Sequence, residues 1–250
     1  MKVTISGEYS KYRDFIESIP QVFDTCGGET LKDRRNSVKV LHHDGKAFVV
    51  KRFKRVNCIQ SVVYSFFRPT KAERAYRFAE EMRRRGISTP REIAYMEQAR
   101  CGLFSVGYFV SEQSMGVEAF TRLVDPEEFC RPLADAIAGY VVFMHSRGVL
   151  HGDLNSANFL FVEDSKGGYK FDVIDTNRSH FCDGMPTDEQ CLENLKRFTH
   201  RRDLYEYFIR QYAIRRGWDE NATVEKAVKL LERFENRKIK LYLKSATYRV

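Results

Sequence analysis

A cluster of polar residues lies between two apolar stretches in the segment VLHGDLNSANFLF, residues 149–161, which contains His151, Asp153 and Asn158. A carboxylate in such a loop can accept a hydroxyl proton or orient an acceptor. An asparagine can add an oxygen ligand for a hard cation such as Mg²⁺. The alternative for Asp153 with Asn158 is an Asx-rich turn that caps the next strand. The choice depends on whether other residues of the same chemistry accompany them.

Three further residues have side chains that could act in the same reaction. Lys51 ends the apolar run AFVVK, Glu73 lies in a helical stretch, and Asp175 ends the apolar run FDVID. In phosphoryl transfer a strand lysine meets two phosphates of ATP, and a helix glutamate holds that lysine in place. The order of strand lysine, helix glutamate, HxDxxxxN loop and final aspartate is that of the kinase signature set. The sequence therefore predicts ATP-dependent phosphoryl transfer with Asp153 as the catalytic residue, and Asn158 and Asp175 as Mg²⁺ ligands.

Plainer explanations exist for some of these residues. Lys51 could be an ordinary strand lysine, because basic residues surround it, although its place at the end of an apolar run favours the phosphate role. Glu73 competes with Glu80 on the same charged helix, where a solvated surface is the usual explanation. For His151 a structural hydrogen bond that holds the loop is preferred to acid–base catalysis.

The elements that must position these residues can be read from hydrophobic periodicity and turn signals. Residues 37–55 read as two strands joined at Asp44-Gly45, and residues 70–85 have the helical period. Residues 94–114 supply two more strands, and a helix is expected from just after Pro126 to His145. A short strand follows the Gly167-Gly168 turn, and residues 188–245 are almost all helical and basic.

This succession predicts an α+β fold with two lobes. Residues 1–112 form a small β-rich N-lobe that binds ATP. Residues 113–250 form a larger helical C-lobe with the catalytic loop, the metal site and a basic helical tail. Together they make one kinase-like domain, with the loop at residues 149–161 at the mouth of the cleft between the lobes.

The composition indicates which classes of partner the protein could bind. The chain has 250 residues, a formal charge of +8 and a pI of about 9.1, so an anionic partner such as nucleotide phosphates, nucleic acid or an acidic membrane face is expected. No nucleic-acid recognition motif accompanies the charge. The longest apolar stretch, YVVFM at 140–144, is too short to span a bilayer, and the N-terminal residues have no signal-peptide core. The six cysteines show no CxxC pair, which favours reduced thiols in a cytoplasmic protein.

The segments VLHGDLNSANFLF and VIDTNR, together with VVKRFK, RPTKAERAY and GISTP, resemble the lipopolysaccharide-core kinases. That family includes the Kdo and heptose kinases and the InaA-like proteins, remote relatives of protein kinases. The resemblance runs from about Gly28 to His180. It implies a glycolipid acceptor with an inner-core sugar hydroxyl, and it places Arg178 with Asn177 near the phosphates or the acceptor sugar. A kinase of this fold that acts on a protein or small molecule, and a pseudokinase that only binds, remain the alternatives.

The sequence also departs from the protein-kinase pattern. It has no GxGxxG loop, and Arg34, Arg35 and Asn36 are expected to stand in for it. The metal-binding triplet reads DTN, Gly152 occupies the centre of the HxD triplet, and the APE segment and a long activation loop are missing. Control by activation-loop phosphorylation and a long peptide substrate are therefore less expected.

The C-terminal third is crowded with lysine and arginine. Such a run is most often a solvated helical face, but a glycolipid acceptor would place the enzyme at the inner face of the inner membrane. Each basic side chain near an anionic leaflet contributes about 1 kcal/mol. Salt-reversible peripheral binding through Arg237, Lys238 and Lys240 is therefore expected, with added contact from the aromatic residues of LYLKSATY.

Overall fold

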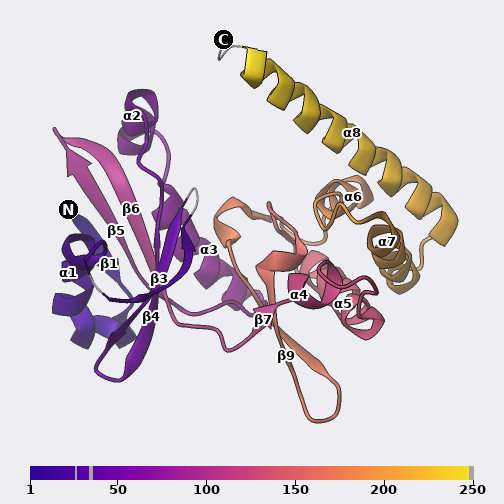
Figure 1. Ribbon diagram of the computed structural model, residues 1–250, viewed down its shortest axis with the longest axis horizontal. Helices are drawn as coiled ribbons and strands as arrows, with labels where there is room; N and C mark the ends of the chain where they lie inside the picture. Colours follow the sequence, from indigo (N-terminus) through magenta and orange to yellow (C-terminus); the bar gives the residue numbers. More distant parts are fainter. Residues whose placement is uncertain (26, 34–35, 248–250) are drawn as a thin grey trace. The chain divides into compact units, whose positions relative to one another are not determined.

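The computed structural model describes residues 1–25, 27–33 and 36–247, without the side chains of 238 and 241–247. The chain divides into two compact units (Figure 1). The first comprises Met1–Met115 and Asp172–Arg178, and the second comprises Gly116–Phe171 and Ser179–Val250. The sequence had grouped Asp175 with the C-lobe. In the structure Asp175 belongs to the same unit as Lys51.

An antiparallel sheet of six strands forms the centre of the first unit, in the order β1-β5-β6-β4-β3-β2. The strands are β1 (Lys2–Ile5), β2 (Glu29–Asp33), β3 (Ser37–His43), β4 (Lys46–Arg52), β5 (Glu92–Arg100) and β6 (Leu103–Ser111). The expected hairpin is confirmed, because Asp44 and Gly45 join β3 to β4 with φ angles of 47° and 70°. Two positive φ values match the twist of the flanking strands. Lys51 therefore lies on an interior strand.

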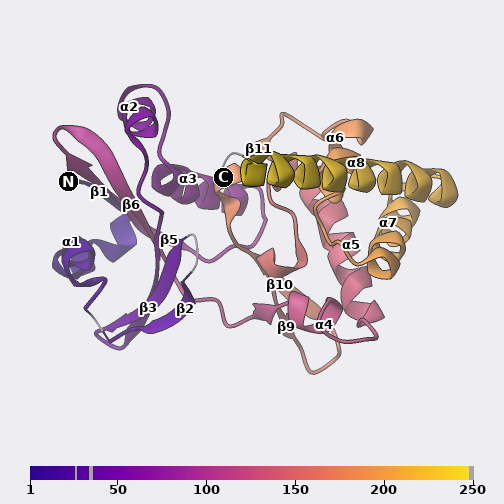
Figure 2. The same cartoon turned by 45° about the horizontal axis from the view of Figure 1, so that its top comes forward.

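Helices cover both faces of this sheet (Figures 1 and 2). A 3₁₀ turn η1 (Gly7–Tyr12) and helix α1 (Arg13–Val22) precede Phe23, and Ile16, Ile19 and Phe23 pack into one apolar cluster. Helix α3 (Lys71–Arg84) packs Ala72 and Ala75 into the cluster on the other face. The helix predicted over 70–85 is confirmed, and the side chain of its N-cap residue accepts a backbone N–H bond. Helix α2 (Cys58–Phe66) lies against β6 and was not predicted.

Residues 172–178 are fastened to the first unit by hydrogen bonds. Strand β10 (Tyr169–Val173) brings the chain to this point, and η3 (Thr176–Arg178) then packs on α3. The carboxylate of Asp172 accepts from the hydroxyls of Ser88 and Ser114, each at 2.6 Å, and the N–H of Val173 donates to the carbonyl of Ser88. The backbone on the N-terminal side of Asp175 is therefore fixed.

The second unit is mainly helical. Its helices are α4 (Phe120–Leu123), α5 (Arg131–Ser146), α6 (Asp188–Leu195), α7 (Arg202–Arg216) and α8 (Glu220–Thr247). Its short elements are β7 (Val117–Glu118), β8 (Val149–Leu150), η2 (Ser156–Asn158), β9 (Phe159–Glu163) and β11 (His180–Phe181). Figure 2 shows α8 crossing α6 and α7, on which it packs. The predicted helical content of residues 188–245 is confirmed.

The helix expected from just after Pro126 begins later, at Arg131. Pro132 suits the first turn of a helix because its missing N–H has no partner there in any case. The guanidinium of Arg201 donates to the carbonyl oxygens of Pro126 and Glu127, which holds the preceding segment out of the helix. Across the described part of the chain, no helix combines the length and apolar character that a membrane span requires.

Candidate active site

An ion pair joins the strand lysine to the last aspartate of the predicted set. Lys51 Nζ lies 2.9 Å from Asp175 Oδ1, and the same oxygen accepts a bond of 2.6 Å from Asn177 Nδ2. The Lys51 side chain is 17% exposed and that of Asp175 is 32% exposed. Opposite charges attract more strongly where water is partly excluded. The structure thus brings together two residues predicted to act on ATP and its metal.

The backbone at Asp175 adopts a conformation that side chains disfavour. Its φ is +60°, and among the described non-glycine residues only Asp44 and Cys101 share a positive φ. Asp44 and Cys101 occupy tight hairpin turns, where the left-handed conformation is needed. Asp175 instead follows a strand and precedes η3. Such strain costs about 1–3 kcal/mol and is concentrated at functional sites.

The loop that carries Asp153 is held by its own polar residues. The N–H of Asp153 donates to His151 Nδ1 at 3.2 Å, and the carbonyl of Asp153 accepts from the side-chain amides of Asn155 at 3.0 Å and Asn158 at 2.7 Å. The amide nitrogen of Asn158 is thereby used, which leaves its oxygen for a cation. Among the residues that the structure describes, none bonds to the half-buried carboxylate of Asp153.

His151 has the structural role expected of it. Its side chain is almost fully buried, and its Nδ1 accepts the Asp153 N–H, which leaves the ring proton on Nε2. The carbonyl of His151 accepts from Asn194 Nδ2 at 2.6 Å, so helix α6, which carries Asn194, holds the loop in place. This contact ties the loop to the interior of the second unit.

A chain of buried hydrogen bonds continues from Asn194. Asn194 Oδ1 can only accept, so His145 Nε2 carries a proton and donates to it at 3.1 Å. His145 Nδ1 then accepts from the Tyr212 hydroxyl at 2.7 Å, and that hydroxyl accepts from Arg216 at 2.8 Å. Burial is the largest cause that lowers the pKa of His145, to about 4, and the Arg216 charge adds to it. The neutral imidazole is the form that completes the chain.

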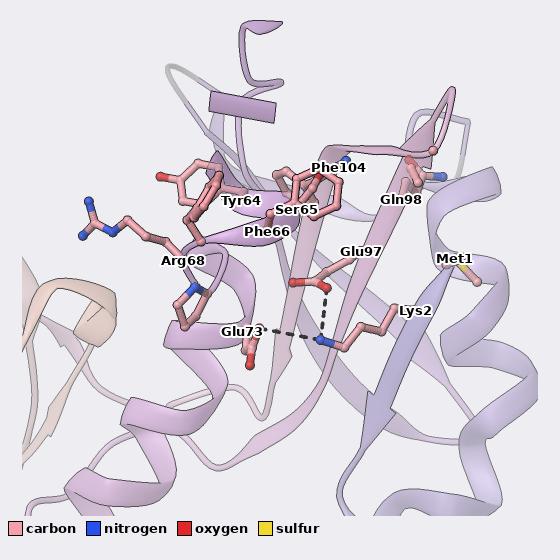
Figure 3. A pocket seen from close by; sticks show the side chains of 14 residues that line it. Met1, Lys2, Tyr64, Ser65, Phe66, Arg68, Glu73, Glu97, Gln98 and Phe104 are labelled. Carbon is pink, nitrogen blue, oxygen red and sulfur yellow. Dashed lines mark hydrogen bonds and ion pairs between the residues drawn. The ribbon is translucent and has the colours of Figure 1, made fainter. Parts of the chain in front are cut away.

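Glu73 does not contact Lys51 in this structure. It occupies the first turn of α3, where its N–H donates to Thr70, and its carboxylate pairs with Arg77 at 2.5 Å and with Lys2 at 3.7 Å. Figure 3 shows Glu73 with Lys2 and Glu97 at the wall of a pocket of about 470 Å³. Glu73 therefore links the first turn of α3 to Lys2 of the edge strand β1. Glu80, its rival in the sequence, lies exposed on the same helix.

The other residues predicted for the site lie near the chain surface or outside the described residues, apart from Asn177. Arg178 lies exposed at the end of η3, three residues after Asp175. Arg34 and Arg35, expected to replace the glycine-rich loop, lie outside the described residues, and Asn36 accepts from the N–H of Lys54. The sequence did not predict the contact between Asn177 and Asp175. Asn177 is buried, and its side-chain amide donates to the carboxylate of Asp175. Its spacing of two residues from Asp175 is the signal that could have found it.

The oxygen donors fit a hard divalent cation. Mg²⁺ in kinases is usually bound by one or two protein ligands together with substrate phosphates. Each unit by itself carries one oxygen donor of this kind, the carboxylate of Asp175 in the first and the side-chain amide oxygen of Asn158 in the second. Both are the ligand types that Mg²⁺ prefers over nitrogen or sulfur.

Comparison with known proteins identifies the family. The family model described as lipopolysaccharide kinase (Kdo/WaaP) family matches residues 29–212, most of the chain. The protein belongs to the lipopolysaccharide kinase (Kdo/WaaP) family. It is therefore a member of a kinase family, which implies the use of ATP.

Two known proteins are similar to this chain, one in its fold and one over a local segment of its sequence. The solved structure of WaaP in complex with acyl carrier protein matches with a TM-score of 0.60 and 20% identity, over 97% of this chain and 100% of that one. The predicted protein-kinase-like α+β fold is thereby confirmed. CBL-interacting protein kinase 30 of Oryza sativa subsp. japonica is 39% identical over 85 residues. That match covers 32% of this chain and 17% of the rice protein, so it concerns a local segment of the kinase.

The buried His145 gives the kinase a specific response to pH. Its pKa is lowered from 6.5 to about 4, so below pH 6.5 the unfolded chain takes up a proton that the folded chain does not bind. We expect the free energy of unfolding to fall between about pH 6.5 and 5, with a slope from this group that approaches 1.4 kcal/mol per pH unit. Urea titrations at several pH values measure it.

The matched control is the variant His145→Gln, which lacks the titrating group. Its unfolding free energy should be lower than that of the parent at pH 7, and the difference between the two should shrink as the pH falls. Parallel pH profiles for the two proteins would show that His145 is protonated in the folded state.

Proposed function

We propose that the kinase transfers the γ-phosphate of ATP, with Mg²⁺, to a hydroxyl of a lipopolysaccharide inner-core sugar, Kdo or heptose. The observation that carries the proposal is the contact of 2.9 Å between Lys51 and Asp175. The two residues have the chemistry of the phosphate-binding and metal-binding positions of kinases, and the family match covers both.

In the proposed reaction the acceptor oxygen attacks the γ-phosphorus in line with the oxygen that leaves on ADP. Asp153 accepts the proton of the attacking hydroxyl, and its unengaged carboxylate suits that task. Lys51 would bind phosphate oxygens, and Asp175 and Asn158 are the residues that would hold Mg²⁺, which would supply charge neutralisation on the phosphate oxygens. Arg178, exposed beyond η3, is proposed to contact the phosphates or the acceptor sugar.

The Lys51–Asp175 pair also suggests how the site accommodates ATP. A half-buried charge is costly without a partner, and here each residue neutralises the other. Nucleotide phosphates would replace Asp175 as the partner of Lys51, and Mg²⁺ would replace Lys51 as the partner of Asp175. Both charges would thus stay compensated. Asn177, bonded to the same carboxylate, would keep Asp175 in place during the exchange.

The lipid anchor of such an acceptor places the proposed reaction at the inner face of the inner membrane. The charge of +8 agrees with a phosphate-rich or acidic surface. A protein acceptor is the second candidate, favoured by the local match to a rice protein kinase. Autophosphorylation without glycolipid phosphorylation would favour that candidate.

The first prediction from the proposed reaction concerns Asp153. Asp153→Ala should lower phosphate transfer to purified lipid A–core by at least about 100-fold, because the general base is lost. The fold should persist, since no described residue bonds to the carboxylate. A radiolabelled-phosphate assay measures transfer, and circular dichroism checks the fold. Transfer at the parental rate in a folded Asp153→Ala protein would remove Asp153 from the mechanism.

The second prediction concerns the metal. Asp175→Ala should abolish the Mg²⁺ dependence of nucleotide binding, because the carboxylate that binds the cation is gone. Calorimetry with a non-hydrolysable ATP analogue, with and without Mg²⁺, measures this. Asp183→Ala, which removes an exposed acid eight positions away, serves as the matched control. An unchanged Mg²⁺ effect in Asp175→Ala would assign the metal to other residues.

The third prediction concerns the acceptor. Deletion of the gene should remove one phosphate from lipid A–core, and restoring the intact gene should return it, whereas the Asp153→Ala gene should not. Mass spectrometry of the extracted glycolipid resolves the difference of one phosphate. Identical phosphate content in parent and deletion strains would exclude this acceptor and leave the protein-kinase alternative.

A further inference from the structure

Helix α2 presents an apolar face to solvent. Ile59 is 77% exposed, Val62 is 41% exposed and Phe66 is 70% exposed, and Phe67, just after the helix, is 76% exposed. Residues three, four and seven positions apart lie on one face of a helix, so the first three form a single stripe. No residue of α2 is buried. We call Ile59, Val62, Phe66 and Phe67 the α2 face.

The opposite face of α2 is polar and points to the protein. The Ser61 hydroxyl donates to the carbonyl of Phe104 on β6, and the Ser65 hydroxyl accepts from the N–H of Phe104 at 2.8 Å. The Tyr64 ring meets the Phe104 ring edge-on at 5.7 Å. A surface helix ordinarily packs its apolar stripe inward and exposes its polar residues. In α2 the arrangement is reversed, and hydroxyl groups attach the helix while its apolar stripe stays uncovered.

Basic residues flank the α2 face in the sequence. Lys54 and Arg55 precede the helix and Arg68 follows it, and all three are exposed. Between Asp44 and Glu73 the sequence contains no acidic residue. Glu73 itself is buried and paired with Lys2 and Arg77. Arg68 belongs to the lining of the pocket in Figure 3, and its guanidinium end extends outward there. The apolar stripe is therefore flanked by cations that no acid in the same stretch neutralises.

We propose that the α2 face docks onto an anionic lipid bilayer. Amphipathic helices with this composition lie in the interface plane, with the apolar side buried about 5–10 Å at the boundary of headgroups and acyl chains. Ile59, Val62, Phe66 and Phe67 enter this boundary. The flanking cations contact lipid phosphates, and the attraction weakens as salt rises.

The size of the patch favours a bilayer over a folded partner. Nine helical residues span about 13 Å, and four apolar side chains cover far less than the roughly 800 Å² per partner that a stable protein interface buries. A bilayer requires no complementary shape, since it closes around whatever enters it. Phe66 and Phe67 lie at the edge of the pocket of about 470 Å³ and remain largely exposed, which leaves both rings accessible to lipid.

This inference goes beyond the proposed kinase reaction and does not depend on it. The α2 face belongs to the same unit as Lys51 and Asp175, and α2 begins seven positions after Lys51. It also differs from the expectation that the C-terminal basic residues bind the membrane, because it adds an apolar contact that salt cannot screen. Binding through α2 should therefore keep a residual component at high salt.

Sedimentation of the full chain with vesicles tests the proposal. Phosphatidylcholine vesicles that contain phosphatidylglycerol should bind the protein, and pure phosphatidylcholine vesicles should bind it at least about fivefold more weakly. Phe66→Gln with Phe67→Gln should weaken partitioning about tenfold or more, at low and at high salt. Arg55→Glu with Arg68→Glu should weaken it at low salt only. Because these side chains are exposed, the thermal midpoints should match the parent.

Two matched controls complete the design. Ile214→Gln removes an exposed apolar residue of α7, and Arg237→Glu with Lys240→Glu reverses exposed charges of α8. When either control is combined with the phenylalanine variant, the loss of vesicle binding that the phenylalanine variant causes should keep the same size. The proposal is overturned if the parent fails to bind anionic vesicles, or if binding depends on α8 and not on Phe66 and Phe67. It is also overturned if the phenylalanine variant converts a dimer to a monomer in light scattering, since a second copy would then cover the face.

Discussion

The candidate active site exists because a lysine on β4 and an aspartate from far along the chain form an ion pair in one unit. That contact requires residues 172–178 to join the sheet of the first unit. The hydrogen bonds of Asp172 and Val173 to Ser88 secure the entry. The left-handed backbone at Asp175 then redirects the chain into η3. The strain at this one residue is tolerated because bonds on both sides fix it.

The loop that carries Asp153 depends on a different kind of support. Polar side chains fix its backbone directly, and behind them a buried chain of hydrogen bonds leads from His151 through Asn194 and His145 to Tyr212. Such a chain is stable only when every donor meets an acceptor. One tautomer of one neutral histidine satisfies this condition, so the geometry of the loop and the protonation of the interior are linked.

Sequence reasoning succeeded where the signal is local. The Asp44-Gly45 turn and the period of α3 each lie within a short stretch. It was less informative where partners are distant. Strand β1 pairs with β5, and this brings Lys2 to Glu73, a contact that no periodicity encodes. Helix α2 was not predicted. Its apolar stripe faces solvent, whereas sequence-based prediction assumes that such a stripe faces the core.

The path of the chain has a consequence for how this protein can change over evolutionary time. The backbone leaves the first unit after Met115, returns for Asp172–Arg178 and leaves again. A gene fragment that ended at Met115 would encode the sheet and Lys51 but not the partner of Lys51. Neither unit can therefore be exchanged as a cassette between relatives by a single crossover. Recombination that preserves the Lys51–Asp175 contact must transfer both segments together.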